Sequence, residues 1–259
     1  MRWLSLVLLC SLILPVLVEG QTETLDPMQQ ANSAYREGDY ETAIVVYAGL
    51  LDAGVRDAVV YFNLGNAYFQ TGDLGLAMLN YRRAQHLIPR DTELNENMTR
   101  IRARRIDLPA EETDPVNNLS AITAAIMTLN ELAWIVLMIW VLWGGVLAVV
   151  ILRSEWRSRL QVPLVVVSGV LLFGILLLGS RLYVEASRPA AVVIAPIAPV
   201  MSGPGDDYLE HFQIFEAAEV RALEMRDGWV RFSLPGGRQG WIAQENIAFV
   251  DIDARLESE

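Results

Sequence analysis

The sequence has almost no cysteine and no lysine. Its single cysteine, Cys10, lies in the first of three hydrophobic blocks, so no disulfide framework can form. Leu8 and Leu9 stand where the lipid-attachment motif of a lipoprotein has small residues, which disfavours lipidation at Cys10. All twenty cationic side chains of the 259-residue chain are therefore arginines, a bias that we attribute to codon usage.

Groups that carry catalysis are equally scarce. The two histidines, His86 and His211, lie in different parts of the chain. The sequence has no glycine-rich phosphate loop, no clustered metal-ligand spacing and no serine with a His-Asp pairing. The acidic pair Asp206-Asp207 follows the turn sequence SGPG, which indicates a solvated turn rather than half of a metal or acid-base site. The sequence therefore predicts a protein that is not an enzyme and needs no cofactor or metal.

The charge of the chain is strongly negative, −11 at pH 7. Residues 21–118 hold nine arginines and fifteen acids, and residues 188–259 hold six arginines and twelve acids. Each of these parts has a net charge of −6, whereas residues 119–187 are close to neutral. Acidic surfaces repel the phosphates of nucleic acids and anionic lipid head groups. We therefore expect no nucleic-acid binding and no electrostatic docking on a lipid surface.

The apolar share of 53% exceeds that of a typical soluble domain and is concentrated in three blocks. The first block, residues 1–20, has Arg2 near its start, an apolar run from Trp3 to Leu17, and small or short residues before Gln21. This order is typical of a secretory signal peptide that is cleaved before Gln21. An uncleaved membrane anchor is the alternative interpretation.

The other two blocks predict transmembrane helices at residues 133–152 and 162–182. Twenty residues at about 1.5 Å each extend for roughly 30 Å, the thickness of the hydrocarbon core of a bilayer. The loop at residues 153–161 contains Arg153, Arg157 and Arg159, and cationic loops face the cytoplasm. The parts before and after this hairpin are then both external, as a signal peptide independently requires.

The residues beside the first span are less distinctive. Residues 107–132 are weakly apolar in their second half, which indicates a linker, an interfacial helix or an extension of the first span. Trp134 stands where an interfacial anchor belongs. Glycines within the spans favour close helix packing. None forms a GxxxG pair, so they predict this packing only weakly. They are Gly144, Gly145, Gly169, Gly174 and Gly179.

Residues 27–60 and 61–94 repeat one pattern at a constant spacing. The identical pairs are Asn32 and Asn66, Gly38 and Gly72, Asp39 and Asp73, Ala43 and Ala77, and Tyr47 and Tyr81. Each Gly-Asp pair predicts the end of one helix, with glycine at positive φ, and the N-cap of the next. Gly65 and its counterpart Ala31 let two helices approach closely. Pro89 is expected to stop the second helix of the second copy.

A helix-turn-helix period of this length resembles the tetratricopeptide repeat. A chance helical hairpin is the alternative. The first copy departs from the pattern at its start, where Pro27 and Gln30 stand in place of Tyr61 and Leu64. We therefore expect its first helix to be shorter.

A third helix is predicted to begin at the N-cap Asp91 and to complete a repeat region at residues 25–106. Leu94, Met98 and Ile101 share one face of this helix. Repeat arrays need a terminal capping helix with a polar outer side. The side chains that supply it are Asn95, Glu96, Arg100, Arg102 and Arg104, and we interpret them as a solvated surface rather than an anion site.

Three polar residues form a stripe on the first helix of each copy. The stripes are Gln29, Asn32 and Arg36 in the first copy, and Asn63, Asn66 and Gln70 in the second. Resemblance to tetratricopeptide repeats implies that this face lines a concave surface that binds an extended peptide. An ordinary hydrated helix face is the alternative, and repetition of the stripe favours the binding groove.

The region at residues 189–252 has a different pattern, in which short strands alternate with Gly, Pro and Asp turns. The segments RDGW and PGGRQGW are hairpin signals. About sixty residues of short strands predict a small all-β barrel. The segments VMSGP and GWVRFSLPGGRQGWI resemble the bacterial SH3-like family through Ser202, Gly203, Pro204, Trp229, Gly240 and Trp241.

One departure from the SH3-like pattern concerns a turn. Ala217 and Ala218 stand where that family commonly has a glycine turn. Trp229 and Trp241 belong either to a ligand-binding surface or to the core of the barrel, and core is the more common place for such tryptophans.

The sequence therefore predicts a multidomain membrane protein with all-α repeat hairpins, a two-helix transmembrane hairpin and a small β domain. This domain order resembles the BatE family of the bacterial aerotolerance (Bat) operon. The resemblance implies location in the bacterial inner membrane with both soluble parts in the periplasm. It also implies protein partners with von Willebrand A domains and a role in tolerance of envelope stress.

We expect a non-enzymatic scaffold that presents two interaction modules. The alternative is a cell-wall protein whose SH3-like domain binds peptidoglycan and whose repeats recruit a hydrolase.

Overall fold

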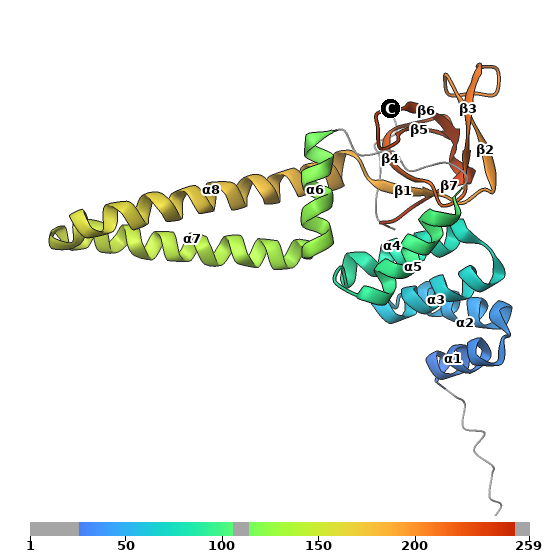
Figure 1. The fold of residues 1–259 in the computed structure, drawn as a ribbon, viewed down its shortest axis with the longest axis horizontal. Coiled ribbons are helices and arrows are strands. Elements are labelled where there is room, and N and C mark those ends of the chain that lie inside the picture. The colour runs from blue at the N-terminus through green and yellow to red at the C-terminus, as the bar shows by residue number, and fades with distance from the viewer. Residues whose placement is uncertain (1–25, 106–113, 252–259) are drawn as a thin grey trace, which may run out of the picture.

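The computed structural model describes residues 26–105 and 114–251, so the predicted signal segment lies outside the described residues. These residues form eight α-helices and a seven-stranded antiparallel sheet (Figure 1). A mixed architecture with an N-terminal helical part, two long apolar helices and a C-terminal β part is thus confirmed.

The first five helices form a stack of hairpins at the N-terminal end (Figure 1). Their bounds are α1 Pro27–Glu37, α2 Tyr40–Asp52, α3 Ala58–Thr71, α4 Leu74–Leu87 and α5 Thr92–Arg104. Gly38 and Gly72 end α1 and α3 in the left-handed conformation, with φ of 84° and 93°. The expectation of a shorter first helix agrees with 11 residues in α1 against 14 in α3.

Side-chain caps start most of these helices. The carboxylates of Asp39 and Asp91 accept hydrogen bonds from the backbone N–H groups of Thr42 and Leu94. The predicted cap at Asp73 is wrong, because its carboxylate accepts from the Thr71 hydroxyl at 2.7 Å instead. The first turn of α4 is capped from the sheet part instead, because the backbone N–H of Gly75 donates to Oε2 of Glu216 at 3.3 Å.

Gly65 is the point of closest approach between α3 and α4. A Cβ atom at this position would lie 2.6 Å from Cδ1 of Tyr81 and 3.3 Å from the carbonyl oxygen of Ala77. Real Cβ atoms do not approach other atoms so closely, so only glycine fits without a shift of the Tyr81 ring. The small residue predicted at this contact is therefore confirmed.

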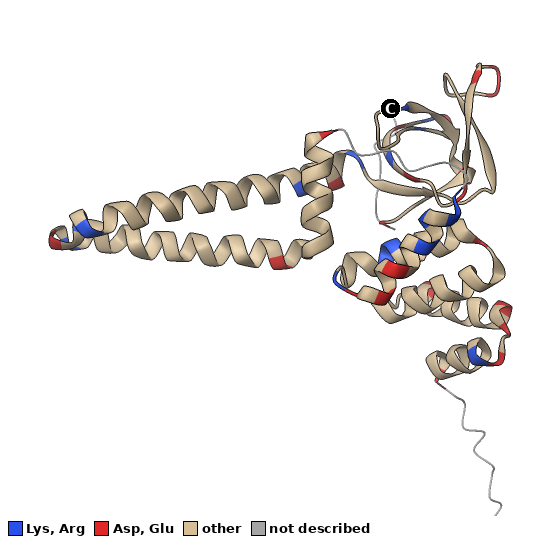
Figure 2. Ribbon diagram, in the orientation of Figure 1, with Lys and Arg blue, Asp and Glu red and all other residues tan. Residues whose placement is uncertain are grey.

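Helices α7 (Leu129–Leu152) and α8 (Arg157–Ser187) form a long antiparallel hairpin. Both are long and apolar enough to cross a membrane, and most of their surface is exposed. A short 3-10 helix, Ser154–Trp156, joins them. Figure 2 shows charged residues at the tip of the hairpin and near its other end, with an uncharged stretch between.

The two long helices contact each other through few specific groups. The indole Nε1 of Trp143 donates to Oγ of Ser168 at 2.8 Å. Of the five glycines noted in the sequence, Gly174 alone has a neighbour at its Cβ position, 3.1 Å from Val136. The other four are not used in the packing of the described residues.

Helix α6 (Pro115–Ile126) lies across the base of this hairpin (Figure 1). It is separate from α7, because Met127 and Thr128 are extended and Thr128 caps α7 together with Glu131. The interpretation of this segment as an extension of the first span is therefore wrong.

The C-terminal part is one antiparallel sheet in the order β3-β2-β6-β5-β4-β1-β7. The strands are β1 Ala190–Val193, β2 Ile197–Met201, β3 Glu210–Phe215, β4 Glu219–Arg226, β5 Trp229–Ser233, β6 Gln239–Ala243 and β7 Ile247–Phe249. The predicted hairpin at RDGW is confirmed, since Arg226 pairs with Trp229 across Asp227 and Gly228, both at positive φ.

The sheet does not close into the barrel that the sequence predicts. Among the described residues, β3 and β7 pair on one side only and form its two edges. Helix α4 meets the β7 end instead, because the guanidinium of Arg83 donates to the carbonyl oxygens of Phe249 and Val250. Contact with the helices takes the place of strand closure at this end.

Strand β1 is buried on both faces. Ala191 and Val193 belong to the core of the sheet, whereas Val192 packs with Met78 and Met98 of the helices. Successive side chains of a strand point to opposite faces. Strand β1 therefore joins the core of the sheet to the core of the repeats, and the two parts form one continuous body.

Candidate functional site

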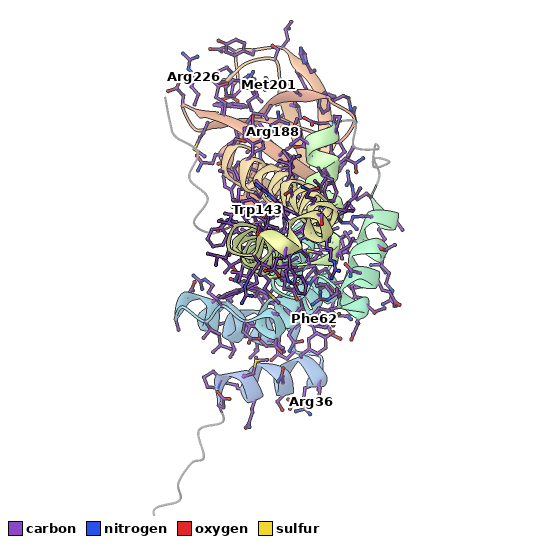
Figure 3. All side chains as sticks on the ribbon, turned by 90° about the vertical axis from the view of Figure 1, so that its left-hand side faces the viewer. Arg36, Phe62, Trp143, Arg188, Met201 and Arg226 are labelled. Carbon is purple, nitrogen blue, oxygen red and sulfur yellow. The ribbon has the colours of Figure 1, made fainter. Side chains whose placement is uncertain are left out.

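The strongest candidate site is a groove on the helical part. Its volume is about 430 Å³, and it lies against α1, α2 and α3. It is lined by Gln29, Asn32, Ser33, Tyr35, Arg36, Tyr47, Asn63 and Asn66. Five of the six residues of the predicted polar stripes are in this lining, and Gln70 is exposed on α3 outside it. Figure 3 places Arg36 at the end of the molecule that is far from the sheet.

The groove is built on a hydrogen-bond ladder between repeats. The Asn32 Oδ1 atom accepts from the hydroxyl of Tyr47 at 2.6 Å and from Nδ2 of Asn63 at 3.2 Å. These three residues belong to α1, α2 and α3. One amide oxygen thus fixes the spacing of three successive helices.

The same ladder recurs one repeat later. The Asn66 Oδ1 atom accepts from the hydroxyl of Tyr81 at 2.6 Å and from Nδ2 of Asn97 at 3.1 Å. Each member lies one full repeat after its counterpart in the first ladder. The hydrogen bonds between the helices therefore recur at the same spacing as the residues in the sequence.

Both tyrosines are held as hydrogen-bond donors. Tyr47 and Tyr81 are 1% and 0% exposed. Burial raises the pKa of each hydroxyl above its ordinary value near 10, and the nearby side chains of Asn63 and Asn97 lower it by less. The two hydroxyls consequently stay protonated at any physiological pH and keep the ladder intact.

This ladder changes the role expected for the two central asparagines. Their side-chain oxygens hold the helices together and are not free to accept from a ligand. Within the described part of the chain, their Nδ2 groups donate to no protein acceptor, so each still offers a donor to the groove. Asn32 and Asn66 are therefore both structural residues and candidate ligand contacts.

Helix α5 carries a third stripe that the sequence reasoning missed. A shift of one further repeat from Asn63, Asn66 and Gln70 leads to Asn97, Arg100 and Arg104. The Arg100 guanidinium donates to Oδ1 of Asn97 at 3.0 Å. The Arg104 guanidinium lies 4.5 Å from the ring centre of Phe69 on α3. The constant spacing of the repeats could have located this third stripe, but we had interpreted α5 as a capping helix and did not extend the spacing to it.

The solvated outer face predicted for α5 is also wrong in part. Asn95 Oδ1 accepts from Gln85 at 2.8 Å, and the guanidinium of Arg102 binds both carboxylate oxygens of Glu219 on β4. Arg82 lies 3.5 Å from the same carboxylate. Asn95 and Arg102 thus bind the neighbouring helix and the sheet, whereas Glu96, Arg100 and Arg104 are exposed as predicted.

Glu219 is the electrostatic centre of the contact between helices and sheet. Burial alone would raise the pKa of its carboxyl, but the charges of Arg82 and Arg102 and the hydrogen bonds of Arg102 lower this pKa to about 2. The carboxylate therefore stays ionised, and the ion pair persists, throughout the neutral range.

The two tryptophans singled out in the sequence are parts of the sheet. Trp241 is 9% exposed on β6 and pairs with Met201 and Arg231 of the neighbouring strands. Trp229 is half-buried at the start of β5. Neither indole lines the groove described above.

The described residues contain no cluster of three or more His, Cys, Asp or Glu side chains that could hold a metal ion. No family model matches the chain, and no match is found among curated proteins or among solved structures.

Proposed function

We propose that the chain is a membrane scaffold whose tetratricopeptide-like groove binds an extended segment of a partner protein. The observation that carries this proposal is the repeated ladder of Asn32, Tyr47 and Asn63, which leaves amide donors facing a groove of about 430 Å³. An extended peptide presents a carbonyl oxygen at each residue, so repeated donors suit it.

The charge of the stripes supports a polar or acidic partner. Arg36 lies at one end of the series, and Arg100 and Arg104 lie at the other. The three stripes together hold three arginines and no acid, so they are more cationic than the acidic chain as a whole. We propose that a partner segment with carboxylates near its ends binds best.

The domain order further supports a BatE-like protein of the bacterial inner membrane. In this proposal α7 and α8 cross the membrane, the loop with Arg153, Arg157 and Arg159 is cytoplasmic, and the repeats and the sheet are periplasmic. The partners are then membrane proteins of the same operon, including those with von Willebrand A domains.

An SH3-like identity for the sheet is supported by one backbone feature. Ala217, which stands where the SH3-like family commonly has a glycine, adopts a left-handed φ of 60°. Because one face of β1 and the side chain of Glu219 are bound to the helices, the sheet has less free surface for a polymer. We therefore favour the scaffold over the peptidoglycan-binding alternative.

The test uses two neighbouring glutamines of α1 in the full-length protein. Gln29 lines the groove and makes no side-chain hydrogen bond among the described residues, whereas exposed Gln30 is outside the lining. Gln29→Trp should fill the groove and reduce co-purification of membrane partners by about tenfold or more, a loss of roughly 1.4 kcal/mol. Gln30→Trp is the matched control and should retain them. Equal loss in both variants, or in neither, would contradict the groove.

A further inference from the structure

Helix α6 places its polar side against the protein and exposes its apolar side. Asn117, Ser120 and Thr123 are buried. Leu119, Ile122 and Ile126, here named the α6 stripe, are 37%, 53% and 53% exposed. A helix on a soluble body has the opposite arrangement, since burial of apolar surface stabilises its packing.

Helix geometry shows where the α6 stripe points. At about 100° per residue, its three members fall within roughly 60° of one another. Asn117, Ala121 and Ala124 fall on the opposite side, where they line small cavities against the repeats and the sheet. The stripe therefore points away from the small cavities against the soluble body, and the hairpin of α7 and α8 also extends away from that body (Figure 1).

Arginines fix α6 at both ends. Arg188, which follows α8, binds the side chains of Asp114 and Asn117 at the N-terminal end of α6. Arg181 donates to the carbonyl oxygen of Met127 at 2.8 Å, just past the C-terminal end. A guanidinium at this end also complements the helix dipole. The direction of the stripe is thus set by the framework of the protein.

The repeats also contact the C-terminal end of α6 and the start of α7. Arg90, in the loop between α4 and α5, donates to the carbonyl oxygen of Ile126 at 3.2 Å. It also pairs with Glu131 at 2.6 Å. Helix α6 is therefore connected to the soluble body as well as to α8.

Aromatic side chains mark this level of the hairpin as an interface between water and lipid. Trp134 on α7 is 65% exposed, and Tyr183 on α8 is 56% exposed. Tyr183 lies two residues after Arg181, which holds α6. Exposed Trp and Tyr at span ends are typical of the head-group region. Both aromatic residues are close in sequence to groups that hold α6, Glu131 and Arg181, so this end of the spans and α6 lie at one level.

We propose that α6 is an interfacial helix whose stripe of Leu119, Ile122 and Ile126 is embedded in the lipid leaflet on the side of the soluble body. The contact is apolar, in keeping with an acidic body that anionic head groups do not attract. The inference is independent of what the groove binds. A helix embedded in this way fixes the height of the repeats above the bilayer.

The test places single cysteines in the full-length protein after Cys10→Ser. Ile122→Cys and Leu119→Cys probe the stripe. Val45→Cys, at a position 70% exposed on α2, is the control for water, and Ile175→Cys, at a position 49% exposed on α8, is the control for deep lipid. Each variant is labelled with an environment-sensitive fluorophore and inserted, one copy per disc, into phosphatidylcholine nanodiscs.

Head-group nitroxide lipids should quench the labels at residues 122 and 119 at least about twofold more than the label at residue 45. Nitroxides deep in the acyl chains should quench the label at residue 175 most. Labels at 122 and 119 that are as accessible to iodide as the label at 45 would place α6 in water. Labels shielded from iodide but quenched by neither lipid would mean that protein covers the stripe. Either result overturns the proposal.

Discussion

Asn66 joins three helices through one oxygen atom. Its Oδ1 accepts from Tyr81 on α4 and from Asn97 on α5, while Asn66 itself belongs to α3. A buried hydroxyl that loses its partner keeps the full cost of its desolvation. The ladder is therefore a source of stability as well as a support for the groove.

Asn66→Ala should accordingly destabilise the protein by about 1–3 kcal/mol, because it leaves the buried Tyr81 hydroxyl without its acceptor. Thermal unfolding of the detergent-solubilised chain measures the effect. Gln70→Ala, on the exposed part of the same stripe, is the control and should change the midpoint little. In a double-mutant cycle, Tyr81→Phe should cost less in the Asn66→Ala background than in the parent. Fully additive losses would contradict the hydrogen bond.

Gly65 allows a matched comparison with a second helical glycine. Gly65→Ala places a methyl group 2.6 Å from the Tyr81 ring and should cost about 1–3 kcal/mol through overpacking. Gly49→Ala, on α2, meets no atom within 4 Å and should stabilise by up to about 1 kcal/mol through helix propensity. Opposite shifts of the unfolding midpoint are expected. A stabilising effect at both positions would show that α3 and α4 do not pack closely.

The sequence predicted the residues of the groove better than their roles. Identity at a constant spacing located the stripes, because repetition is visible without coordinates. It did not show that the oxygens of Asn32 and Asn66 serve Tyr47 and Tyr81. The partner of a side chain depends on the distance between helices, which composition and spacing do not provide.

Among the elements, α5 and β1 differ most from expectation. The helix was predicted as a solvated cap, yet Gln85 of α4 and Glu219 of the sheet bind two of its polar side chains, Asn95 and Arg102. Strand β1 lies in the region predicted as a small barrel, with no prediction that helices cover one of its faces. The continuous apolar run AAVVIA was the available signal, since a strand with one exposed face alternates polar and apolar residues. A run without alternation indicates burial on both faces, but it does not identify what covers the second face.

Glu219 makes the contact between α5 and the sheet sensitive to acid. Its folded-state pKa of about 2 lies below the ordinary value of 4.5. The contribution to stability is therefore fully present above about pH 4.5 and is lost as the pH falls toward 2. Thermal midpoints between pH 7 and pH 3 should fall more steeply for the parent than for Glu219→Gln, which has no titrating group here. Parallel curves would show that the ion pair contributes nothing to stability.

Gly75 lies in a second contact between the helices and the sheet, that of α4 with β1, which depends on shape rather than on charge. A Cβ atom at this position would lie 2.7 Å from the carbonyl oxygen of Val193 and 2.8 Å from Cα of Ile194. Gly75→Ala should therefore separate α4 from β1, and hydrogen exchange in β1 should increase while exchange in α1 stays unchanged. Gly49→Ala serves again as the control for the substitution itself. Protection of β1 equal to that of the parent would contradict the close approach.

At the scale of the whole molecule, the repeats and the sheet lie together at one end of the hairpin (Figure 1). The basic loop lies at the other end. This arrangement requires both soluble parts to be on the same side of any membrane that the hairpin crosses. The sequence supported that topology in two ways, since the arginines of the loop outnumber its acids and a signal peptide is predicted at residues 1–20.

Topology can be measured with an impermeant thiol reagent on spheroplasts that express single-cysteine variants. Cysteines in place of exposed Asp52 on α2 and Asp227 in the β4–β5 turn should both be labelled. A cysteine in place of Ser158, in the basic tip, should react only after the membrane is permeabilised. Labelling at residue 158 together with protection at 52 and 227 would reverse the proposed orientation.

Burial of β1 on both faces has a consequence for the order of biogenesis. Met78 and Met98 precede the hairpin in the chain, whereas the strand that covers them follows it. In the proposed topology, the repeats are exported before β1 is made, and their apolar surface stays uncovered until α7 and α8 have both crossed the membrane. In that topology, the repeats can be covered by β1 only after both α7 and α8 have been inserted. A chain in which α7 is inserted and α8 is not would keep that apolar surface exposed to chaperones and proteases.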